Sequence, residues 1–540
     1  MKPYYITTPI YYVNDRPHIG HCYSTLVADV AARYQRLMGR DVFFLTGTDE
    51  HADKVVTTAA TAGLSPLDWA DKNAAEFEKA FALMGFTHDD FIRTTQDRHK
   101  LKVLDYVRAL QATGDVYLGD YVGWYDESQD EYLTETVAKE SPQGPYTSPV
   151  TGKPLAKRTE KNYFFRLSKY EQPLRAHIQQ QADFIQPEAR KNEVLGRLRD
   201  GLQDVPISRA IGSDPASQWG IRMPDDPSHR IYVWIDALFN YLSAIDTPER
   251  QRYWPPAVHV MAKDILWFHA VVWPAMLMAL DKPLPRQVYA HAYWVREGKK
   301  MSKSLGNFVD IDTLRAYINK FGLDAVRYYL ITQGPLAQTD ADFNHAKFVE
   351  VFNADLANGL GNATSRVGNM IAKYFDGRCP DPQGHTGLAG YDWPSLIQTR
   401  VRAAIARADM FDLSGALAEG LALVRQVDQY INATEPFKLA KKVEAEPAKR
   451  DDLAAILYHC AEALRVATLL MSPAIPTGTA AVFAHWSIKP INPAAGQTLA
   501  HASAWDGPHA LKPGQPIAKG EILFMRADAA DPPPTPATHA

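Results

Sequence analysis

Cysteine is rare in this sequence. Only three occur among 540 residues, at Cys22, Cys379 and Cys460, and no two of them have the CxxC spacing of a metal or redox motif. The spacing argues against a disulfide framework and against a zinc site built from thiolates. Such sparing use of cysteine fits a reducing compartment.

A large excess of either charge is also missing. Lys and Arg together number 58 and Asp and Glu 62, which gives a net charge of −4 at pH 7. The chain therefore has no overall basic field for nucleic acid, and any contact with RNA must use local patches.

Long apolar runs are absent as well. No segment reaches roughly 18 uninterrupted apolar residues, the length that spans a bilayer. The N-terminal sequence MKPYYITTPIYYV lacks the apolar run and the small-residue cleavage site of a signal peptide. We therefore expect a soluble, unprocessed, cytoplasmic protein with no membrane partner.

The composition is that of a globular chain. With 46% hydrophobic and 22% charged residues over this length, we expect two to four domains. Only the last residues, DAADPPPTPATHA, are rich enough in proline to predict disorder.

The first 51 residues have the pattern of a strand, a helix and a second strand. YYITTPIYYV is β-branched and aromatic, as a buried strand is, and NDRP follows as a turn. Apolar residues from Cys22 to Leu37 then recur at steps of three and four, and Gly39 stands where the helix would end. DVFFLTGTDEH is the second strand. A βαβ unit of this kind places residues 8–12 and 46–51 beside one crevice.

The rest of the chain changes character three times. Residues 117–228 contain many Gly, Pro and charged turns, which predicts an insertion. A sheet-like pattern resumes at Arg230, and after Val349 apolar residues recur at helical spacing, which predicts a helix bundle. The predicted fold class is α/β: a Rossmann-like parallel-sheet domain with a connective insertion, followed by an all-α helix bundle.

Two histidines flank a glycine where the first helix begins, in HIGH at residues 18–21. A helix start offers free backbone N–H groups and the positive end of the helix dipole, which bind phosphate. His18 and His21 would add side-chain donors, and Gly20 would let a base or ribose approach the backbone. The motif is short, and a surface helix start with two incidental histidines explains it equally well.

A lysine-rich turn, KMSKS at residues 300–304, is the second motif. Two cations and two hydroxyls between Gly298 and Gly306 are what a loop that closes on a triphosphate needs. The alternative is a solvated basic loop. A five-letter match nevertheless arises by chance in a chain of this length with odds on the order of one in several thousand.

Together, HIGH and KMSKS resemble the paired motifs of the class I aminoacyl-tRNA synthetases. The closer resemblance is to the methionyl-tRNA synthetase family, and it extends over nearly the whole chain through TTPIYYVNDRPHIGH, FLTGTDEH, NYFFRLSKY, YVWIDALFNY, KDILWFHAVVWPAML and FGLDAVRYYL. The resemblance implies a methionine–tRNA ligase. Such an enzyme uses ATP with Mg²⁺ to convert L-methionine into methionyl-adenylate and pyrophosphate. It then transfers the methionyl group to the 3′ end of methionine tRNAs, including the initiator, for protein synthesis.

The resemblance also implies which residues bind each substrate. Four of them, His18, His21, Lys300 and Lys303, would be catalytic and contact the triphosphate. The ATP site would consist of His18, Gly20, His21, Asp264, Lys300, Ser302 and Lys303, with Asp264 on the ribose. The methionine pocket would consist of Pro9, Ile10, Tyr12, Asp49, Trp234, Ala237, Leu238, Tyr241, Ile265 and His269, with Asp49 on the α-ammonium group. From periodicity alone, ordinary core packing is favoured for Trp234 and Tyr241.

The helical region contains a candidate surface for tRNA. Asn358, Asn362 and Arg366 lie four residues apart on one predicted helix face, with the amide and guanidinium groups that unstacked bases need. By resemblance, Asn362 and Arg366 read the CAU anticodon. Phe437 stands where many relatives have a tryptophan that stacks on it. Without the resemblance, a solvated polar face is favoured.

Two features depart from the family pattern. Relatives that bind zinc have two cysteine pairs in the insertion, where this chain has Asp126, Gln129, Ser148 and Thr151. Without thiolate or imidazole ligands, we expect no structural zinc and no other bound metal. Some relatives continue into a dimerising module, whereas this chain stops near GEILFMRADAAD, so we expect a monomer.

The resemblance gives the expected domains their names. The catalytic domain would comprise residues 1–116 and 229–295, interrupted by the connective insertion at 117–228. Residues 296–348 would form the KMSKS loop and stem-contact region, 349–515 the anticodon-binding helices, and 516–540 a tail with a disordered end.

Three alternatives remain. An isoleucine, leucine, valine or cysteine enzyme would share both motifs, although the short insertion and the missing zinc ligands disfavour them. An HxGH adenylyltransferase that makes a small cofactor would need no helical C-terminal region. A tRNA-binding paralogue without activity would not need intact His18, His21, Lys300 and Lys303.

Overall fold

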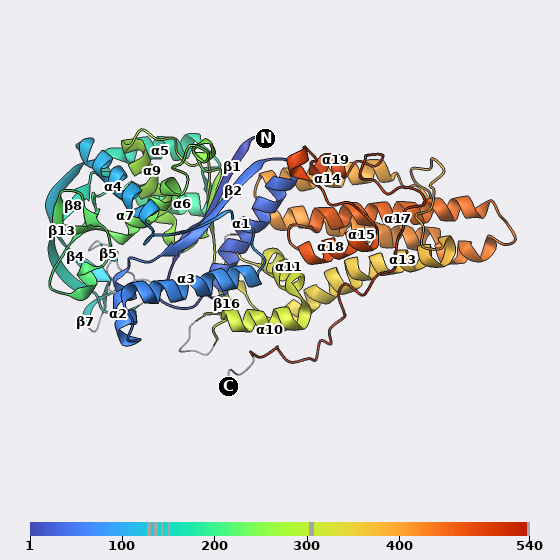
Figure 1. The fold of residues 1–540 in the computed structure, drawn as a ribbon, viewed down its shortest axis with the longest axis horizontal. Coiled ribbons are helices and arrows are strands. Elements are labelled where there is room, and N and C mark those ends of the chain that lie inside the picture. Colours follow the sequence, from blue (N-terminus) through green and yellow to red (C-terminus); the bar gives the residue numbers. More distant parts are fainter. Residues whose placement is uncertain are drawn as a thin grey trace.

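A computed structural model describes residues 1–126, 131–133, 139–141, 144–148, 152–296, 298–301, 307–337 and 339–536. The molecule is elongated (Figure 1). One end is built around a parallel sheet, and the other is an arm of roughly parallel and antiparallel helices. We call the helices from α12 onward the helical arm.

A six-stranded parallel sheet forms the centre of the first part. Its strand order is β3-β2-β1-β14-β15-β9. The first five strands follow the order of a doubly wound dinucleotide-binding sheet, in which ligands bind beyond the carboxyl ends of the strands. The predicted fold class is thereby confirmed. The strands are β1 (Pro3–Tyr12), β2 (Asp41–Asp49), β3 (Asp90–Arg93), β9 (Ile185–Gln186), β14 (Val258–Ala262) and β15 (Val288–His291).

The N-terminal βαβ unit forms as the sequence predicts. Helix α1 (Ile19–Leu37) joins β1 to β2, and Gly39 follows it with a positive φ of 80°. The register aligns Tyr12 with Asp49, so the ends of the two strands lie side by side. On the other side of β2, Gly47 permits close packing against β3, because a Cβ there would lie 1.9 Å from the carbonyl oxygen of Ile92.

Antiparallel sheets lie between β3 and β14 in the sequence. One has the order β10-β8-β4-β5, another β11-β13-β12, and β6 pairs with β7. Their bounds are β4 (Val116–Asp126), β5 (Glu131–Leu133), β6 (Lys139–Ser141), β7 (Gly144–Thr147), β8 (Ala156–Phe165), β10 (Val205–Pro206), β11 (Ser208–Ala210), β12 (Arg222–Met223) and β13 (Asp226–Ile231).

The sheet-like pattern expected from Arg230 is only partly correct. Strand β13 ends at Ile231, and the apolar run continues as helices α7 (Val233–Leu238) and α8 (Asn240–Ser243). The run is buried on all sides, and periodicity cannot distinguish a fully buried strand from a short buried helix. The other helices of this part are α2 (Asp53–Thr61), α3 (Pro66–Leu83), α4 (Asp97–Ala112), α5 (Glu171–Gln180), α6 (Glu188–Arg197), α9 (Trp273–Ala279), α10 (Ile311–Phe321) and α11 (Leu323–Gln333).

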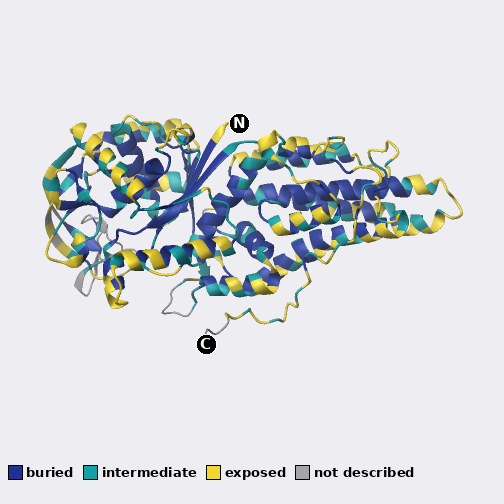
Figure 2. Cartoon of the chain, viewed as in Figure 1, coloured by how far each residue is buried: buried dark blue, intermediate teal, exposed yellow. Residues whose placement is uncertain are grey.

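The predicted helix bundle is also confirmed. The arm consists of α12 (His345–Val351), the π-helix η8 (Phe352–Gly361), α13 (Asn362–Phe375), α14 (Trp393–Asp409), α15 (Leu413–Thr434), α16 (Pro436–Leu439), α17 (Lys449–Met471), α18 (Pro476–His485) and α19 (Leu499–Ala502). Its dark-blue interior in Figure 2 contains the apolar stripes of α13, α15 and α17. Helix α17 is long and apolar enough to cross a membrane, but its apolar window is wholly buried in the protein.

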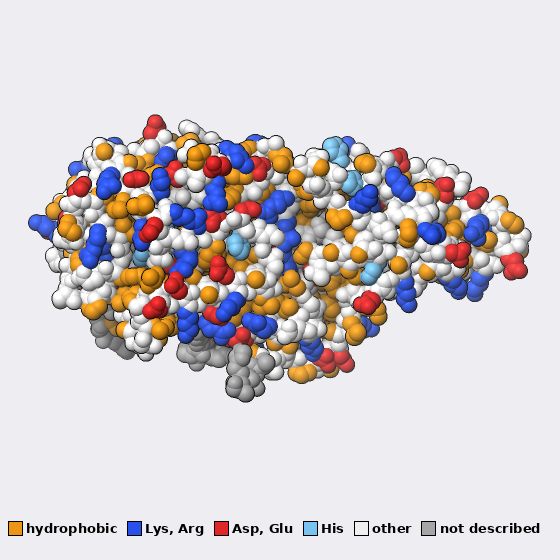
Figure 3. Space-filling model, in the orientation of Figure 1, with side chains coloured by type: hydrophobic (Ala, Val, Ile, Leu, Met, Phe, Trp, Pro, Cys, Tyr) orange, Lys and Arg blue, Asp and Glu red, His pale blue; other side chains and the backbone are white. Residues whose placement is uncertain are grey.

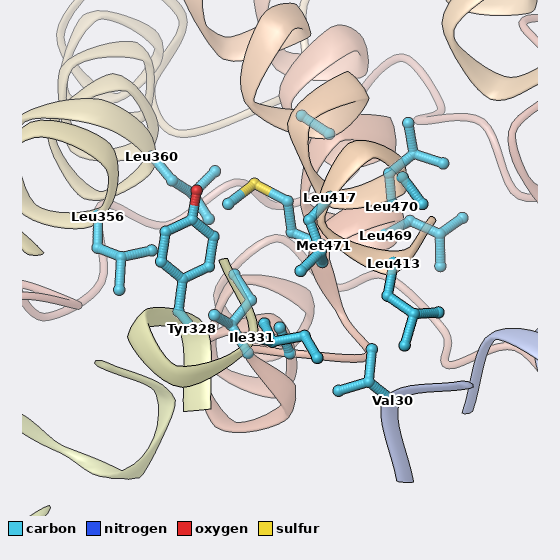
Figure 4. Packing of buried hydrophobic residues seen from close by; sticks show 14 of the residues in the cluster. Val30, Tyr328, Ile331, Leu356, Leu360, Leu413, Leu417, Leu469, Leu470 and Met471 are labelled. Carbon is cyan, nitrogen blue, oxygen red and sulfur yellow. The ribbon is translucent and has the colours of Figure 1, made fainter. Parts of the chain in front are cut away.

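Apolar packing continues from the sheet into the arm. Val30 of α1, Tyr328 and Ile331 of α11, Leu417 of α15 and Leu470 of α17 belong to one buried cluster (Figure 4). Helix α11 therefore lies where the two parts of the molecule meet.

A buried ion pair lies within this junction. Arg327 of α11 is fully buried, and its Nη2 donates to the carboxylate of Asp29 in α1 at 2.6 Å. The guanidinium also donates to the carbonyl oxygens of Met84, Pro473 and Ala474. Burial alone would raise the pKa of Asp29, but the nearby charges of Arg327 and Arg33 lower it. Asp29 therefore stays ionised and holds the arginine in place.

The C-terminal segment lies along the arm. Asn353 and Ala527 exchange two hydrogen bonds, of 2.9 and 3.0 Å. Asp531, within the proline-rich end that we expected to be disordered, is bound by Lys320 and by His345. Residues 537–540 lie outside the described residues.

Replacing the buried arginine should destabilise the protein strongly. Arg327→Met leaves Asp29 buried without its main partner, and we expect the free energy of unfolding to fall by about 3–5 kcal/mol. Arg425→Met is the matched control, since Arg425 is 68% exposed and lies 3.4 Å from Asp355. It should cost at most about 1 kcal/mol. Urea unfolding measures both, and equal losses would contradict the role given to Arg327.

Candidate active site

A cavity of about 320 Å³ opens beyond the carboxyl ends of β1, β2 and β14. Its walls include all ten residues predicted to bind methionine and four of those predicted to bind ATP. The former are Pro9, Ile10, Tyr12, Asp49, Trp234, Ala237, Leu238, Tyr241, Ile265 and His269, and the latter are His18, Gly20, His21 and Asp264. Residues up to 260 positions apart in the sequence are thus brought to one site.

His18 and His21 lie against each other at one end of the cavity. Their ring centroids are 3.8 Å apart, and His18 precedes the first turn of α1 as its N-cap. The Nδ1 atom of His18 accepts from the backbone N–H of Gly20, and Nδ1 of His21 accepts from the backbone N–H of His18. An acceptor Nδ1 on a neutral ring leaves the proton on Nε2. Both histidines can therefore present an Nε2–H donor.

The free backbone N–H groups expected at this helix start are not found. Those of Gly20 and His21 are capped by the His18 ring, and that of Ile19 donates to the carbonyl oxygen of Val309. Phosphate oxygens would therefore meet the histidine side chains instead. The glycine is required because a Cβ on Gly20 would lie 2.8 Å from Cε1 of His18.

Burial keeps His21 neutral. Desolvation, and to a lesser degree the neighbouring His18, lower its pKa well below the ordinary value. A neutral ring that donates from Nε2 needs no protonation step before it meets an anion.

The other end of the cavity is apolar, with a neutral polar pair in its wall. His269 Nδ1 lies 3.0 Å from the carbonyl oxygen of Ile265, which can only accept, so Nδ1 carries the proton. The hydroxyl of Tyr241 then donates to Nε2 of His269 across 2.8 Å. Burial lowers the pKa of His269 to about 4, which agrees with a neutral ring. The Tyr241 hydroxyl and the His269 ring therefore make their hydrogen bonds without placing a charge at the cavity.

Trp234 and Tyr12 form the adjoining aromatic wall, and Phe268 supports Trp234 from outside the cavity lining. Trp234 lies parallel to Phe268 with centroids 4.2 Å apart, and Tyr12 meets Trp234 edge-on at 6.0 Å. Phe268 begins the π-helix η6 (Phe268–Val272), which also carries His269. π-Helical turns are frequent at functional sites, because the extra residue re-aims the side chains beside it. Sequence reasoning missed Phe268, although it lies next to a predicted pocket residue.

Two buried carboxylates beside the cavity interact with His51, which follows β2. Asp49, 3% exposed, ends β2 and accepts from the backbone N–H of His51 at 3.5 Å. Asp236 of α7 lies between His51 and His99, at 2.6 and 2.7 Å from their ring nitrogens. Burial would raise the pKa of Asp236, but His51 and His99 lower it to about 2. This network fixes α7, and with it Trp234, against the end of β2.

Sequence reasoning also missed Ser24, His291 and Tyr293 of the cavity wall. Tyr293 follows β15, lines the cavity and hydrogen-bonds the carboxyl group of Asp264. Ser24 and His291, 2.7 Å apart, connect α1 to the end of β15. His291 and Tyr293 lie at the end of β15 rather than in a motif, and their position at the end of a parallel strand was the signal that could have found them.

The lysine-rich motif is described only at its edge. Lys300 ends strand β17 (Lys299–Lys300), which pairs with β16 (Trp294–Arg296). Ser302 and Lys303 lie outside the described residues, as do Gln129 and Thr151 of the insertion. Asp126 and Ser148 are described and buried. In the described part of the chain, no group of three His, Cys, Asp or Glu residues is placed to hold a metal ion.

The predicted tRNA-reading residues lie on the arm. Asn362 and Arg366 are one turn apart on α13, where Asn362 is exposed and Arg366 is 4.0 Å from Asp428. Phe437 on α16 is 39% exposed. Asn358 is exposed like Asn362, but it lies in the π-helix η8, whose Gly359 has a non-helical ψ of −107°, so the regular α-helical spacing assumed for it does not hold there. Basic and acidic side chains are intermixed over the face in Figure 3.

The sheet, the histidine pair at its first helix and the helical arm define a tRNA synthetase of class I. The family model described as "tRNA synthetases class I (M)" matches residues 4–368. The chain belongs to the methionine–tRNA ligases of that class, as its relatives show.

Two relatives illustrate the similarity in sequence. A methionine–tRNA ligase of Bacillus subtilis is 40% identical over 97% of this chain and 78% of its own length. That of Thermotoga maritima is 40% identical over 98% of this chain and 81% of its own length.

Solved structures show the same fold. Mycobacterium tuberculosis methionyl-tRNA synthetase in complex with methionyl-adenylate superimposes with a TM-score of 0.89 at 35% identity, covering 97% of this chain and 100% of that one. The free form of that enzyme gives a TM-score of 0.82 at 34% identity, over 98% and 99% of the two chains. The predicted family and fold are thus confirmed.

The neutral state of His269 predicts a pH effect on stability. Its pKa is about 4 when folded and about 6.5 when unfolded, so its contribution is present above pH 6.5 and is lost as the pH falls toward 4. Between pH 7 and pH 5, the free energy of unfolding of the unaltered protein should fall by about 2 kcal/mol more than that of His269→Gln. Urea unfolding at both pH values measures this. An identical fall in the two proteins would contradict a neutral buried His269.

Proposed function

We propose that the protein activates L-methionine with ATP, forming methionyl-adenylate and pyrophosphate, and then transfers the methionyl group to the 3′ end of tRNA. The observation that carries this proposal is the single cavity in which a nucleotide end and an apolar amino-acid end adjoin. Attack of the methionine carboxylate on the α-phosphate needs the two substrates to be held in line, and one continuous cavity supports that.

The nucleotide end supplies donors for the phosphates. His18 and His21 each direct an Nε2–H from a ring whose Nδ1 is occupied as an acceptor. Neutral donors that are fixed in advance stabilise charge that develops on phosphate oxygens, without reorganisation during the reaction. In this proposal Asp264, oriented by Tyr293, binds the ribose hydroxyls, and Gly20 leaves room for the adenosine.

The amino-acid end favours an uncharged, flexible side chain. Trp234, which stacks on Phe268 behind it, Tyr12 and the neutral Tyr241–His269 pair offer polarisable and aromatic contacts, which suit a thioether. In this proposal Asp49, a buried carboxylate in the cavity wall, binds the α-ammonium group. A charged side chain would be desolvated here without a partner, which disfavours it.

The lysine-rich motif and the arm complete the proposal. Lys300 and Lys303, with Ser302, would contact the triphosphate in the transition state, and Mg²⁺ would accompany ATP. Asn362, Arg366 and Phe437 would read the CAU anticodon of methionine tRNAs, including the initiator. Amide and guanidinium groups can hydrogen-bond unstacked base edges, and an exposed phenyl ring can stack on one.

We further propose that the protein works as a cytoplasmic monomer without structural zinc. All three cysteines are buried and free, which suits a reducing compartment. Among the described residues, the large apolar side chains that are exposed occur singly or as neighbouring pairs in different parts of the chain, as on most monomers. Buried Asp126 and Ser148 are poor zinc ligands in place of thiolates.

Amino-acid-dependent ATP–pyrophosphate exchange tests the activation step. We expect exchange with methionine and little with leucine, isoleucine, valine or cysteine, because the pocket accepts the thioether chain best. Exchange that prefers another amino acid would refute the proposed substrate. No exchange with any of them would refute the proposed activity.

Removing one lysine should separate catalysis from binding. Lys300→Ala should lower the rate of adenylate formation about 100- to 1,000-fold, as losses of single transition-state contacts do. Methionine affinity should be nearly unchanged, because the methionine pocket does not include Lys300. Lys299→Ala removes the neighbouring exposed charge and serves as the control. Stopped-flow adenylation and equilibrium methionine binding give the two quantities, and equal losses in both would rule out a transition-state role.

A further inference from the structure

A bidentate ion pair joins the loop before the first active-site histidine to the helix that follows the lysine-rich motif. Arg16 lies two residues before His18, in the loop between β1 and α1. Its Nη1 donates to Oδ2 of Asp312 at 2.9 Å, and its Nη2 donates to Oδ1 at 3.3 Å. Asp312 belongs to the first turn of α10. The pair therefore connects two segments that are 296 positions apart in the sequence.

Backbone and ring contacts make the same connection at the next residues. The N–H of Ile19 donates to the carbonyl oxygen of Val309 at 3.0 Å, and His18 forms an antiparallel bridge with Asp310. The Phe308 ring also meets the His18 ring edge-on, with centroids 5.1 Å apart. The segment that carries the histidines is thus held on the start of α10 by its backbone, by a ring contact and by the ion pair.

Helix α10 is a firm support for these contacts. Its buried side chains all belong to the apolar cluster that continues into the arm, and they are those of Ile311, Leu314, Tyr317 and Phe321. The side chain of Asp312 is 14% exposed, whereas that of Arg16 is 46% exposed. Partly exposed ion pairs contribute little to stability, but a bidentate contact with a largely buried carboxylate fixes the orientation of the guanidinium group. We therefore expect the pair to affect geometry more than stability.

The position of His18 decides where both histidines direct their donors. The backbone N–H of His18 donates to Nδ1 of His21, and Nδ1 of His18 accepts from the backbone N–H of Gly20. Pro17 is buried between Arg16 and His18, and its ring restricts the backbone. A movement of Arg16 is therefore transmitted directly to His18. A displacement of about 1 Å in a catalytic group can lower a rate as much as about 100-fold.

We propose that Arg16 is a positioning residue, and that its pair with Asp312 holds His18 and His21 in the geometry that stabilises the phosphates during adenylate formation. This proposal rests on the proposed function, in which the two histidines contact the phosphates. Arg16 acts through His18 rather than on ATP, since neither Arg16 nor Asp312 lines the active-site cavity. The alternative is that Arg16 leaves Asp312 and binds the triphosphate directly.

A double-mutant cycle in the rate of adenylate formation tests the proposal. Arg16→Gln and Asp312→Asn should each lower the single-turnover rate about tenfold, because each releases the loop before His18. The double variant should be no slower than either single variant, because all three lack the same pair. Methionine affinity should stay within about twofold, since the methionine pocket contains neither residue. Stopped-flow adenylation and equilibrium methionine binding give the two quantities.

Arg252→Gln is the matched control. The side chain of Arg252 is 52% exposed and lies 2.9 Å from Asp41, which begins β2 at the edge of the sheet opposite to the cavity. Loss of this pair should leave the adenylation rate within about twofold of that of the unaltered protein. The urea unfolding midpoints of Arg16→Gln and Arg252→Gln should be alike, because both variants lose one partly exposed ion pair.

Other outcomes would overturn the proposal. An unchanged rate in Arg16→Gln would show that the pair does not position the histidines. A loss in Arg16→Gln without one in Asp312→Asn would assign Arg16 to direct contact with the triphosphate. Losses that multiply in the double variant, or an equal loss of methionine affinity, would indicate separate effects on the fold. Absence of methionine-dependent exchange in the unaltered protein would refute the proposed function, and this proposal with it.

Discussion

The ion pair between Asp29 and Arg327 is the constraint on which the arrangement of the two parts of the protein depends. Asp29 belongs to the helix that begins at His18, and Arg327 belongs to α11. The same guanidinium also binds carbonyl oxygens beside α3 and before α18. A buried guanidinium group can take only a few positions, because each of its N–H donors needs a hydrogen-bond acceptor. The helix that presents the histidines and the helices of the arm are therefore held in one fixed relation. The apolar cluster that includes Tyr328 and Leu470 joins the same two parts of the molecule (Figure 4).

The active-site cavity follows from the parallel sheet. Strands β1, β2 and β14 end at the same edge, so side chains from distant parts of the sequence converge there. The cavity wall therefore combines uncharged histidines with two carboxylates. Hydrogen-bonded but uncharged histidines occupy both ends, because burial lowers the pKa of His21 and of His269. The negative charge is confined to Asp49 and Asp264, where an ammonium group and ribose hydroxyls would need it. The site thus matches an amino acid that keeps its ammonium group and is joined to a nucleotide through its carboxyl group.

Much of the fold, and most of the cavity, could be predicted from the sequence. Helical and strand periodicity is a local property, and it identified the βαβ unit and the helices of the arm. The pocket residues came from the resemblance, since periodicity alone favoured core packing for Trp234. The predictions that failed depend on side-chain rotamers and on packing, which the sequence pattern does not determine. The capping of α1 by its own His18 removed the expected free N–H groups. The segment that contains Asn358 is the π-helix η8 rather than the expected α-helix. Arg327 stands in FGLDAVRYYL among residues that are nearly all apolar, and a charge in such a run was the available signal of a buried ion pair.

A crystal structure of the protein with a non-hydrolysable analogue of methionyl-adenylate tests the central claim most directly. The account predicts the thioether between Trp234 and Tyr241, the ammonium group on Asp49, and the ribose hydroxyls on Asp264. It also predicts phosphate oxygens within hydrogen-bonding distance of Nε2 of His18 or His21. An analogue bound with its adenosine in the aromatic end, or with its ammonium group turned away from Asp49, would contradict the assignment of the two ends of the cavity.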